Sequence, residues 1–173
     1  MDEIAGGIIF IGMIKLKDIL KEIGGSNKAY HTTSKDRLDS ILKDGLKINS
    51  KENFSVGSLS WMKTAYKMIP IFVSFEPMKY KDDNSVFLEV DISGIDLVAD
   101  IPSLVENGAY VEDNYIWFES GENIIDPIDD PEQIFFDELT DPYNEYCKKA
   151  MKITKTAAIM EDIPPSKIKV VNK

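Results

Sequence analysis

The only histidine of this 173-residue chain, His31, stands in the segment Tyr30-His31-Thr32-Thr33. With one histidine and one cysteine, Cys147, the chain cannot build a zinc site from His and Cys ligands. A Ser-His-Asp or Cys-His arrangement could use only His31. A lone histidine on a strand also serves often as a structural hydrogen-bonding residue. The residue types alone therefore leave a chemical role and a structural role open for His31.

The residues around His31 predict a strand followed by a capped helix. Residues 29–32 are expected to be extended, and the hydroxyl of Thr33 or Ser34 is expected to cap the next helix. The spacing of Leu38, Ile41 and Leu42 predicts the buried face of that helix. Gly45 is expected to end it in the left-handed region.

The remaining chain alternates apolar segments with turn residues and predicts more strands than βαβ units. The expected class is therefore α+β with a mostly antiparallel sheet. Helices are predicted at 14–23, 61–68, 103–107 and, interrupted at Pro142, 131–151. Strands are predicted at 46–48, 71–75, 86–92, 96–101, 110–119, 154–160 and 167–171.

Length and composition fit one folded unit with a substantial core, since 43% of the residues are hydrophobic. We expect an N-terminal arm and helix over residues 1–28 and a single globular domain over 29–173, with Met1 or Met13 as the start. The apolar segment 4–14 is too short to cross a bilayer and lacks the positive flank of a signal peptide. A single cysteine, expected to be a buried thiol, favours a reducing, cytoplasmic location.

The net charge of −10 is concentrated in one part of the chain. Between Lys81 and Lys148 there is no Lys or Arg, whereas 19 residues are Asp or Glu. Such a stretch repels nucleic-acid phosphates and favours either a solvated face or a surface for a basic partner. Residues 126–132 lack the alternating oxygen ligands and the central glycine of a calcium loop.

Three segments resemble the histidine-type branch of the ADP-ribosyltransferase superfamily. The first is Tyr30-His31-Thr32-Thr33 with its following helix, the second is Pro70-Ile71-Phe72-Val73-Ser74-Phe75 followed by Tyr80, and the third runs from Thr156 to Ile163-Pro164-Pro165. The resemblance implies a split antiparallel β-sheet with flanking helices that grips NAD as a substrate.

The resemblance also implies roles for individual residues. His31 would bind the adenosine ribose, and the backbone at Thr32 would pair with the nicotinamide amide. Ser74 would be the hydroxyl at the end of the second strand, and Tyr80 would stack on nicotinamide.

The third segment departs from the family pattern at its catalytic position. Thr156 stands where many relatives carry a glutamate that stabilises the cation-like transition state. Glu161 and Glu119 are the candidate acids that could replace it. Any turnover is therefore expected to be slow.

Three functions follow as expectations. The first is an NAD-dependent ADP-ribosyltransferase, or a diverged NAD-binding relative, that displaces nicotinamide with a protein or nucleic-acid acceptor. The second is a non-catalytic interaction protein that uses its acidic surface. The third is an RNA 2′-phosphotransferase, which the presence of a single arginine, Arg37, disfavours.

Overall fold

A computed structural model describes residues 26–50, 56–77, 83–118 and 133–171 of the chain. The fold has the predicted α+β class, with a mostly antiparallel sheet. Helix 14–23, Tyr80 and Glu119 lie outside the described residues, so the predictions made for them stay predictions.

The larger sheet has six strands in the order β4-β8-β2-β1-β3-β9, and each neighbouring pair is antiparallel. Its two central strands, β1 and β2, carry the residues around His31 and Ser74. The bounds are β1 Lys28–Ser34, β2 Ile71–Ser74, β3 Ser85–Asp91, β4 Leu97–Val98, β8 Thr156–Ile159 and β9 Ile168–Val170.

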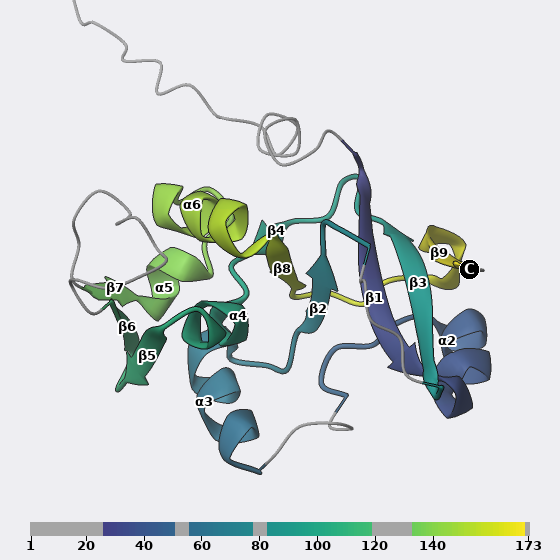
Figure 1. The fold of residues 1–173 in the computed structure, drawn as a ribbon, viewed down its shortest axis with the longest axis horizontal. Helices are drawn as coiled ribbons and strands as arrows, with labels where there is room; N and C mark the ends of the chain where they lie inside the picture. The colour runs from purple at the N-terminus through teal and green to yellow at the C-terminus, as the bar shows by residue number, and fades with distance from the viewer. Residues whose placement is uncertain (1–25, 51–55, 78–82, 119–132, 172–173) are drawn as a thin grey trace, which may run out of the picture.

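The second sheet is a three-stranded meander in the order β5-β6-β7, inserted between β4 and β8. Figure 1 shows this meander and the helices α3 to α6 gathered at the β4–β8 end, whereas α2 lies at the β3–β9 end. The bounds are α2 Leu38–Asp44, α3 Val56–Tyr66, α4 Ile101–Glu106, β5 Ala109–Glu112, β6 Tyr115–Phe118, β7 Gln133–Phe135, α5 Phe136–Leu139 and α6 Glu145–Thr154.

Strand β1 is paired very differently on its two sides. Against β3 it forms seven consecutive residue pairs, from Lys28↔Asp91 to Ser34↔Ser85. Against β2 its register is fixed at one pair, Tyr30↔Ser74. Strands β1 and β2 are therefore joined at a single residue pair, although both lie in the middle of one sheet, and we call the unpaired part of this junction the split.

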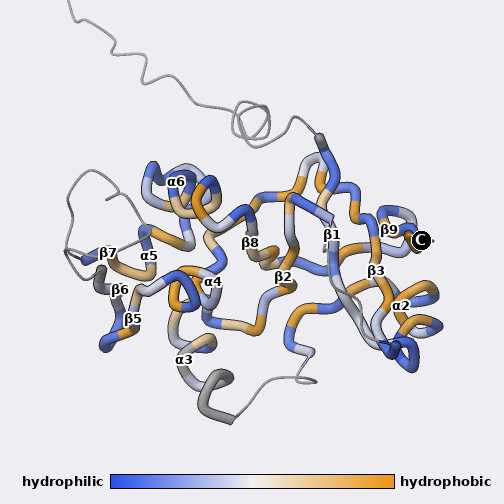
Figure 2. Tube along the Cα trace, in the orientation of Figure 1, coloured by the Kyte–Doolittle hydropathy of each residue, from blue (hydrophilic) through white to orange (hydrophobic). Residues whose placement is uncertain are grey.

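The sequence of β1 is polar for a central strand. Figure 2 shows β1 as mainly hydrophilic and β2 as mainly hydrophobic. A strand of an antiparallel sheet with one face on the core usually alternates apolar and polar residues. In β1 only Ala29 and Thr33 are buried, and the side chains from Tyr30 to Thr32 are half-buried. The polar side chains of β1 fit a strand that borders a cavity.

The helix after β1 begins differently from the prediction. A short 3₁₀ helix, Lys35–Arg37, precedes α2, and neither helix receives a side-chain cap from Ser34. The Thr33 hydroxyl is buried without a hydrogen-bond partner in the described part of the chain. The predicted cap is therefore wrong, because the chain enters the helix through a 3₁₀ turn.

Gly45 ends α2 at the predicted position with a positive φ of 84°, but its ψ of 180° differs from the expected left-handed helical conformation. An added Cβ there would clash with the Ile163 carbonyl oxygen, so a side chain has no room. The predicted strand 46–48 is reduced to one bridge, Leu46↔Ile163, which ties this segment to the Pro-Pro region.

Two other predictions are corrected by pairing between strands. The extended stretch predicted at 110–119 is a hairpin, in which β5 and β6 turn at Asp113 with a positive φ of 50°. The helix predicted at 131–151 is broken into β7, α5 and α6, because Gln133–Phe135 pairs with β6.

The core is continuous between the larger sheet and the helices at its β4–β8 end. Cys147 on α6 is fully buried, and burial raises its pKa to about 12, which confirms an inert apolar thiol. Among the described helices, none is both long enough and apolar enough to cross a membrane.

Candidate functional site

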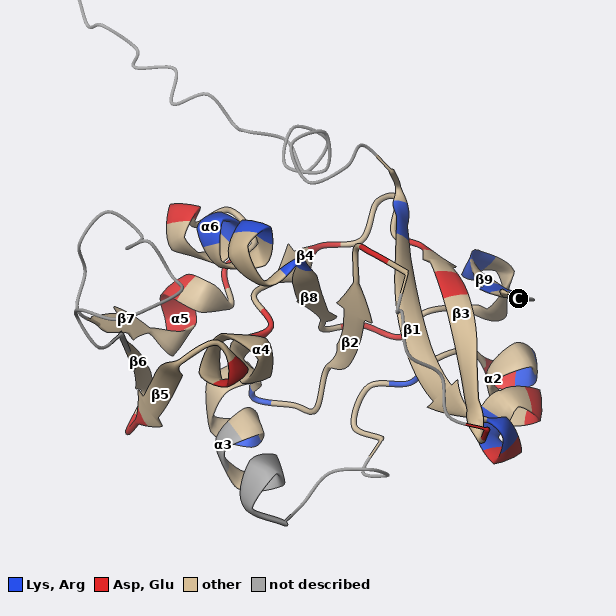
Figure 3. Cartoon of the chain, viewed as in Figure 1, with Lys and Arg blue, Asp and Glu red and all other residues tan. Residues whose placement is uncertain are grey.

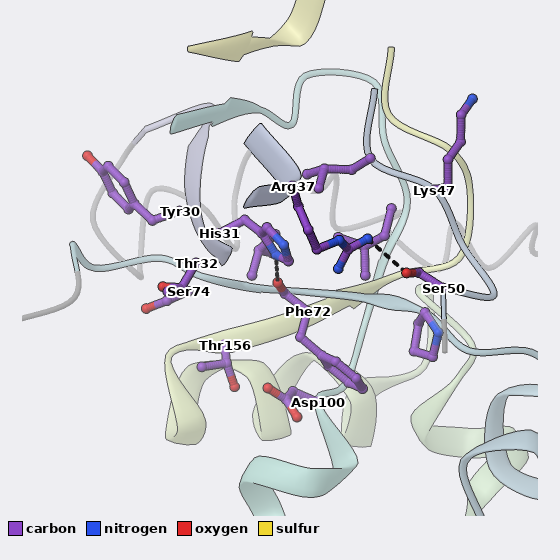
Figure 4. Close-up of a pocket in the computed structure, with 14 residues that line it drawn as sticks. Tyr30, His31, Thr32, Arg37, Lys47, Ser50, Phe72, Ser74, Asp100 and Thr156 are labelled. Carbon is purple, nitrogen blue, oxygen red and sulfur yellow. Dashed lines mark hydrogen bonds between the residues drawn. The ribbon is translucent and has the colours of Figure 1, made fainter. Parts of the chain in front are cut away.

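A cavity of about 330 Å³ opens at the split between β1 and β2 (Figure 4). Small-molecule sites in proteins are about 300–1,000 Å³, so a ligand of moderate size could occupy this space. It is lined by residues of β1, the 3₁₀ helix, β2, β8 and the segments after α2, before β2 and after β4: Tyr30, His31, Thr32, Arg37, Leu46, Lys47, Ser50, Pro70, Ile71, Phe72, Val73, Ser74, Asp100 and Thr156.

His31 reaches across the split. Its Nδ1 lies 2.8 Å from the Phe72 carbonyl oxygen. If the antiparallel ladder continued beyond Tyr30↔Ser74, Thr32 would face Phe72, so the imidazole bonds to a carbonyl at the point where the ladder fails. The side chain thus links the two strands without closing the space between them.

The imidazole of His31 is neutral near pH 7. The residue as a whole is half-buried, but its ring lies deep, and this burial lowers its pKa below the ordinary 6.5. The nearby Arg37 charge adds to the depression, whereas the bond to Phe72 opposes it. Because a carbonyl can only accept, Nδ1 carries the proton and Nε2 is left as an acceptor for a ligand hydroxyl.

Asp100 supplies a carboxyl group at the opposite side of the cavity. Ser74 pairs with Thr156 across β2 and β8, and Val98 pairs with Ala158 across β4 and β8. Asp100 follows the end of β4 by two residues, which places it beside Thr156 (Figure 4). The cavity therefore has a buried acid next to Thr156.

The environment of the Asp100 carboxyl suits proton transfer. The residue is only 5% exposed, and this burial raises its pKa. Hydrogen bonds from the Ser103 amide (3.0 Å) and hydroxyl (2.8 Å) oppose the increase and cap α4. The Thr156 hydroxyl lies near enough to lower the pKa slightly, but it completes no hydrogen bond with Asp100.

Tyr66, the last residue of α3, holds the backbone on both sides of Asp100. Its hydroxyl donates to the Ala99 carbonyl and accepts from the Ile101 amide, both at 2.8 Å. Its ring packs edge-on against Phe72 at a centroid distance of 6.1 Å. Tyr66 therefore connects the strand that bonds His31 to the residue that follows β4.

The outer part of the cavity carries positive charge. Arg37, the only arginine, lines the cavity, and its Nη2 donates to the Ser50 hydroxyl at 2.9 Å. Lys47 also lines it and forms an ion pair of 3.1 Å with Asp162, both side chains being half exposed. The site thus combines cations on one side of His31 with a buried carboxyl on the other (Figure 4).

The predicted site residues are brought together only in part. His31, Thr32 and Ser74 all line the cavity. The Ser74 hydroxyl also forms a local turn, donating to the Glu76 carbonyl at 2.8 Å.

Of the two candidate acids, only Glu161 falls within the described residues. It is exposed beyond the end of β8 and is not among the residues that line the cavity. Its neighbour Asp162 accepts a hydrogen bond from the Ile48 amide at 3.0 Å, which fixes the segment that carries Lys47.

Sequence reasoning missed Asp100 and Tyr66. In the sequence, Asp100-Ile101-Pro102 has the pattern of a helix start, with an acidic cap and an early proline. That pattern could have located the start of α4. Only the register of β4 against β8 shows that the capping residue, Asp100, lines the same cavity as His31.

Among the described residues, no group of three or more His, Cys, Asp or Glu side chains is arranged to hold a metal ion. No protein-family model, curated protein or solved structure matches this chain, so its function is inferred from the cavity and the residues that line it.

Proposed function

We propose that the chain binds NAD in the cavity between β1 and β2 and cleaves its nicotinamide–ribose bond slowly, as an ADP-ribosyltransferase or a diverged relative of one. The observation that carries this proposal is the neutral imidazole of His31 held across a split sheet, between cations and a buried acid. The Nε2 atom accepts a hydrogen bond from a ribose hydroxyl, and the charges of Arg37 and Lys47 attract the pyrophosphate.

Asp100 takes the part of the acid in this proposal. When the bond between the anomeric carbon and the pyridinium nitrogen breaks, nicotinamide leaves with both electrons, and positive charge develops on the ribose. Water or an acceptor hydroxyl forms the new bond to that carbon and passes its proton to a carboxylate. The Asp100 carboxyl stabilises the developing charge and accepts the proton, a role that its raised pKa favours.

A second candidate function is recognition of a 2′-phosphate on RNA, as in RNA 2′-phosphotransferases. The observation in its favour is that the single arginine of the chain lines the cavity near His31. A guanidinium group matches phosphate oxygens in a bidentate manner. The NAD proposal accounts for more of the site, because it also gives the buried carboxyl of Asp100 a role.

Calorimetry with NAD and with a 2′-phosphorylated RNA tests the two candidates directly. We expect heat of binding with NAD, slow release of nicotinamide, and no response to the RNA. Binding of the RNA alone would favour the second candidate. Absence of binding to either ligand would leave the acidic, non-catalytic interaction protein as the remaining expectation.

Asp100→Asn tests the acid separately from the fold. Asparagine caps a helix as well as aspartate does, so α4 and the folded state should be retained. We expect nicotinamide release to fall by about 10²–10³-fold with little change in NAD affinity, the usual effect of losing one preorganised electrostatic group. Unchanged turnover would exclude Asp100 as the acid and return the assignment to Glu161 or Glu119.

Thr156→Glu sharpens this test because it restores the family's residue beside Asp100. Alone, it places two carboxyl groups together, so one of them is held protonated and turnover should not rise. Combined with Asp100→Asn, it should recover part of the lost turnover. If Thr156→Glu changes NAD turnover equally in the wild type and in Asp100→Asn, then positions 100 and 156 do not share one role.

A further inference from the structure

The meander β5-β6-β7 presents one face made of aromatic side chains. Opposite partners in the register lie on the same face, which places Tyr110 with Trp117, and Tyr115 with Phe135. The other face carries Ala109, Ile116 and Ile134, which are buried in the core. We define the first four residues, Tyr110, Tyr115, Trp117 and Phe135, as the aromatic face.

The rings of the aromatic face form one continuous cluster. Tyr110 and Trp117 are stacked, with centroids 6.3 Å apart and planes 10° apart. Tyr115 meets Trp117 edge-on at 5.5 Å and Phe135 edge-on at 5.9 Å. Tyr110 is 43% exposed and Phe135 46% exposed, whereas Tyr115 and Trp117 are half-buried. Tyrosine, tryptophan and phenylalanine are the residues enriched at protein interfaces.

The charge around the aromatic face is acidic. It lies within the stretch from 82 to 147 that contains no Lys or Arg. Glu112 is exposed on the same face opposite Tyr115, and Asp113 is exposed at the adjoining turn. Figure 3 shows no Lys or Arg on β5, β6 or β7. Beyond the end of β7, Lys67 Nζ lies 3.8 Å from Asp137 Oδ1.

We propose that the aromatic face is a docking surface for a basic protein segment that bears arginine or lysine side chains. Guanidinium and ammonium groups bind to the faces of tyrosine and tryptophan rings, and the neighbouring carboxylates add charge complementarity. Single-stranded nucleic acid also stacks on aromatic sheet faces, but it requires a basic groove, which this surface lacks. A second copy of the chain would bring two acidic faces together, which costs electrostatic energy.

Titration of the ¹⁵N-labelled full chain with a short arginine/serine peptide tests the proposal. The control is a glutamate/serine peptide of equal length. We expect the arginine peptide to shift the Trp117 indole resonance, assigned with a Trp61→Phe variant, and the amides of β5 and β6. Increasing salt should weaken the binding. The glutamate peptide should shift neither group.

Variants then locate the surface. Tyr110→Ala with Phe135→Ala should weaken binding about three- to tenfold, since each ring contributes a modest cation–π contact. Tyr143→Ala is the matched control, because Tyr143 is 64% exposed in the same acidic stretch but lies outside the aromatic face. It should bind as the wild type does. If the double variant does not fold, charge reversal by Glu112→Lys at an exposed position should still reduce the affinity.

Several outcomes would overturn the proposal. Equal affinity in the wild type and the aromatic or Glu112 variants would place the basic peptide elsewhere. A shift of Trp117 by single-stranded oligouridine, but not by the arginine peptide, would identify nucleic acid as the occupant. Self-association in sedimentation that Phe135→Ala abolishes would show that a second copy covers the face.

Discussion

The two sides of strand β1 differ in what they do for the protein. On the β3 side, seven residue pairs close the ladder, and Leu88 opposite His31 is fully buried. On the β2 side, one registered pair is followed by a cavity, and a side chain rather than the backbone bonds across the gap. One side of β1 therefore stabilises the fold, and the other side exposes polar groups to the cavity.

The largest effect is expected from a substitution on the β3 side, and it should be a loss of stability. Leu88→Ala should lower the free energy of unfolding by about 2–5 kcal/mol, because it leaves a void in the core beside β1. Chemical denaturation measures this loss. NAD affinity per folded molecule should stay unchanged, and a parallel loss of affinity would contradict the separation between the two sides.

A substitution on the β2 side should weaken ligand binding and leave stability largely unchanged. His31→Ala should weaken NAD binding by about 1–3 kcal/mol, the cost of removing a hydrogen bond to a buried polar group, and leave the folded state largely intact. Calorimetry and denaturation of the same preparation measure both effects. Equal NAD affinity in the variant and the wild type would end the ligand role of His31.

The smallest expected effect is a pH dependence that belongs to His31. Its pKa is lowered in the folded state, so the unfolded chain takes up the proton first as the pH falls below 6.5. The contribution of His31 to stability is therefore complete above pH 6.5 and is lost as the pH falls from there towards the folded pKa. NAD affinity should weaken as the pH falls further, through the folded pKa, because a protonated Nε2 no longer accepts a hydrogen bond.

His31→Gln provides the control for this pH dependence. A glutamine can still donate to the Phe72 carbonyl, but it does not titrate. The difference in unfolding free energy between the wild type and His31→Gln should therefore be constant above pH 6.5 and shrink below it. A constant difference down to about pH 5 would show that His31 titrates as it does in the unfolded chain.

The strands of the larger sheet were predictable, because runs such as 71–75 and 86–92 combine apolar and β-branched residues between turn signals. The meander was not, because pairing with β6 overrides the local preference of residues 133–135. His31, Thr32 and Ser74 could be placed at one site from the sequence. Asp100 could not, because its proximity to Thr156 depends on the pairing of β4 with β8, in which Val98 lies opposite Ala158, 60 positions later in the chain.

The buried thiol of Cys147 has a practical consequence for measuring the split itself. Since its pKa is about 12 and it is fully buried, native Cys147 should not react with maleimide or methanethiosulfonate labels. Two cysteines introduced at exposed positions, one at Lys28 on β1 and one at Glu76 after β2, would then be the only sites that accept spin labels. The distance distribution between those labels would report directly whether a bound nucleotide draws the two strands together or holds them apart.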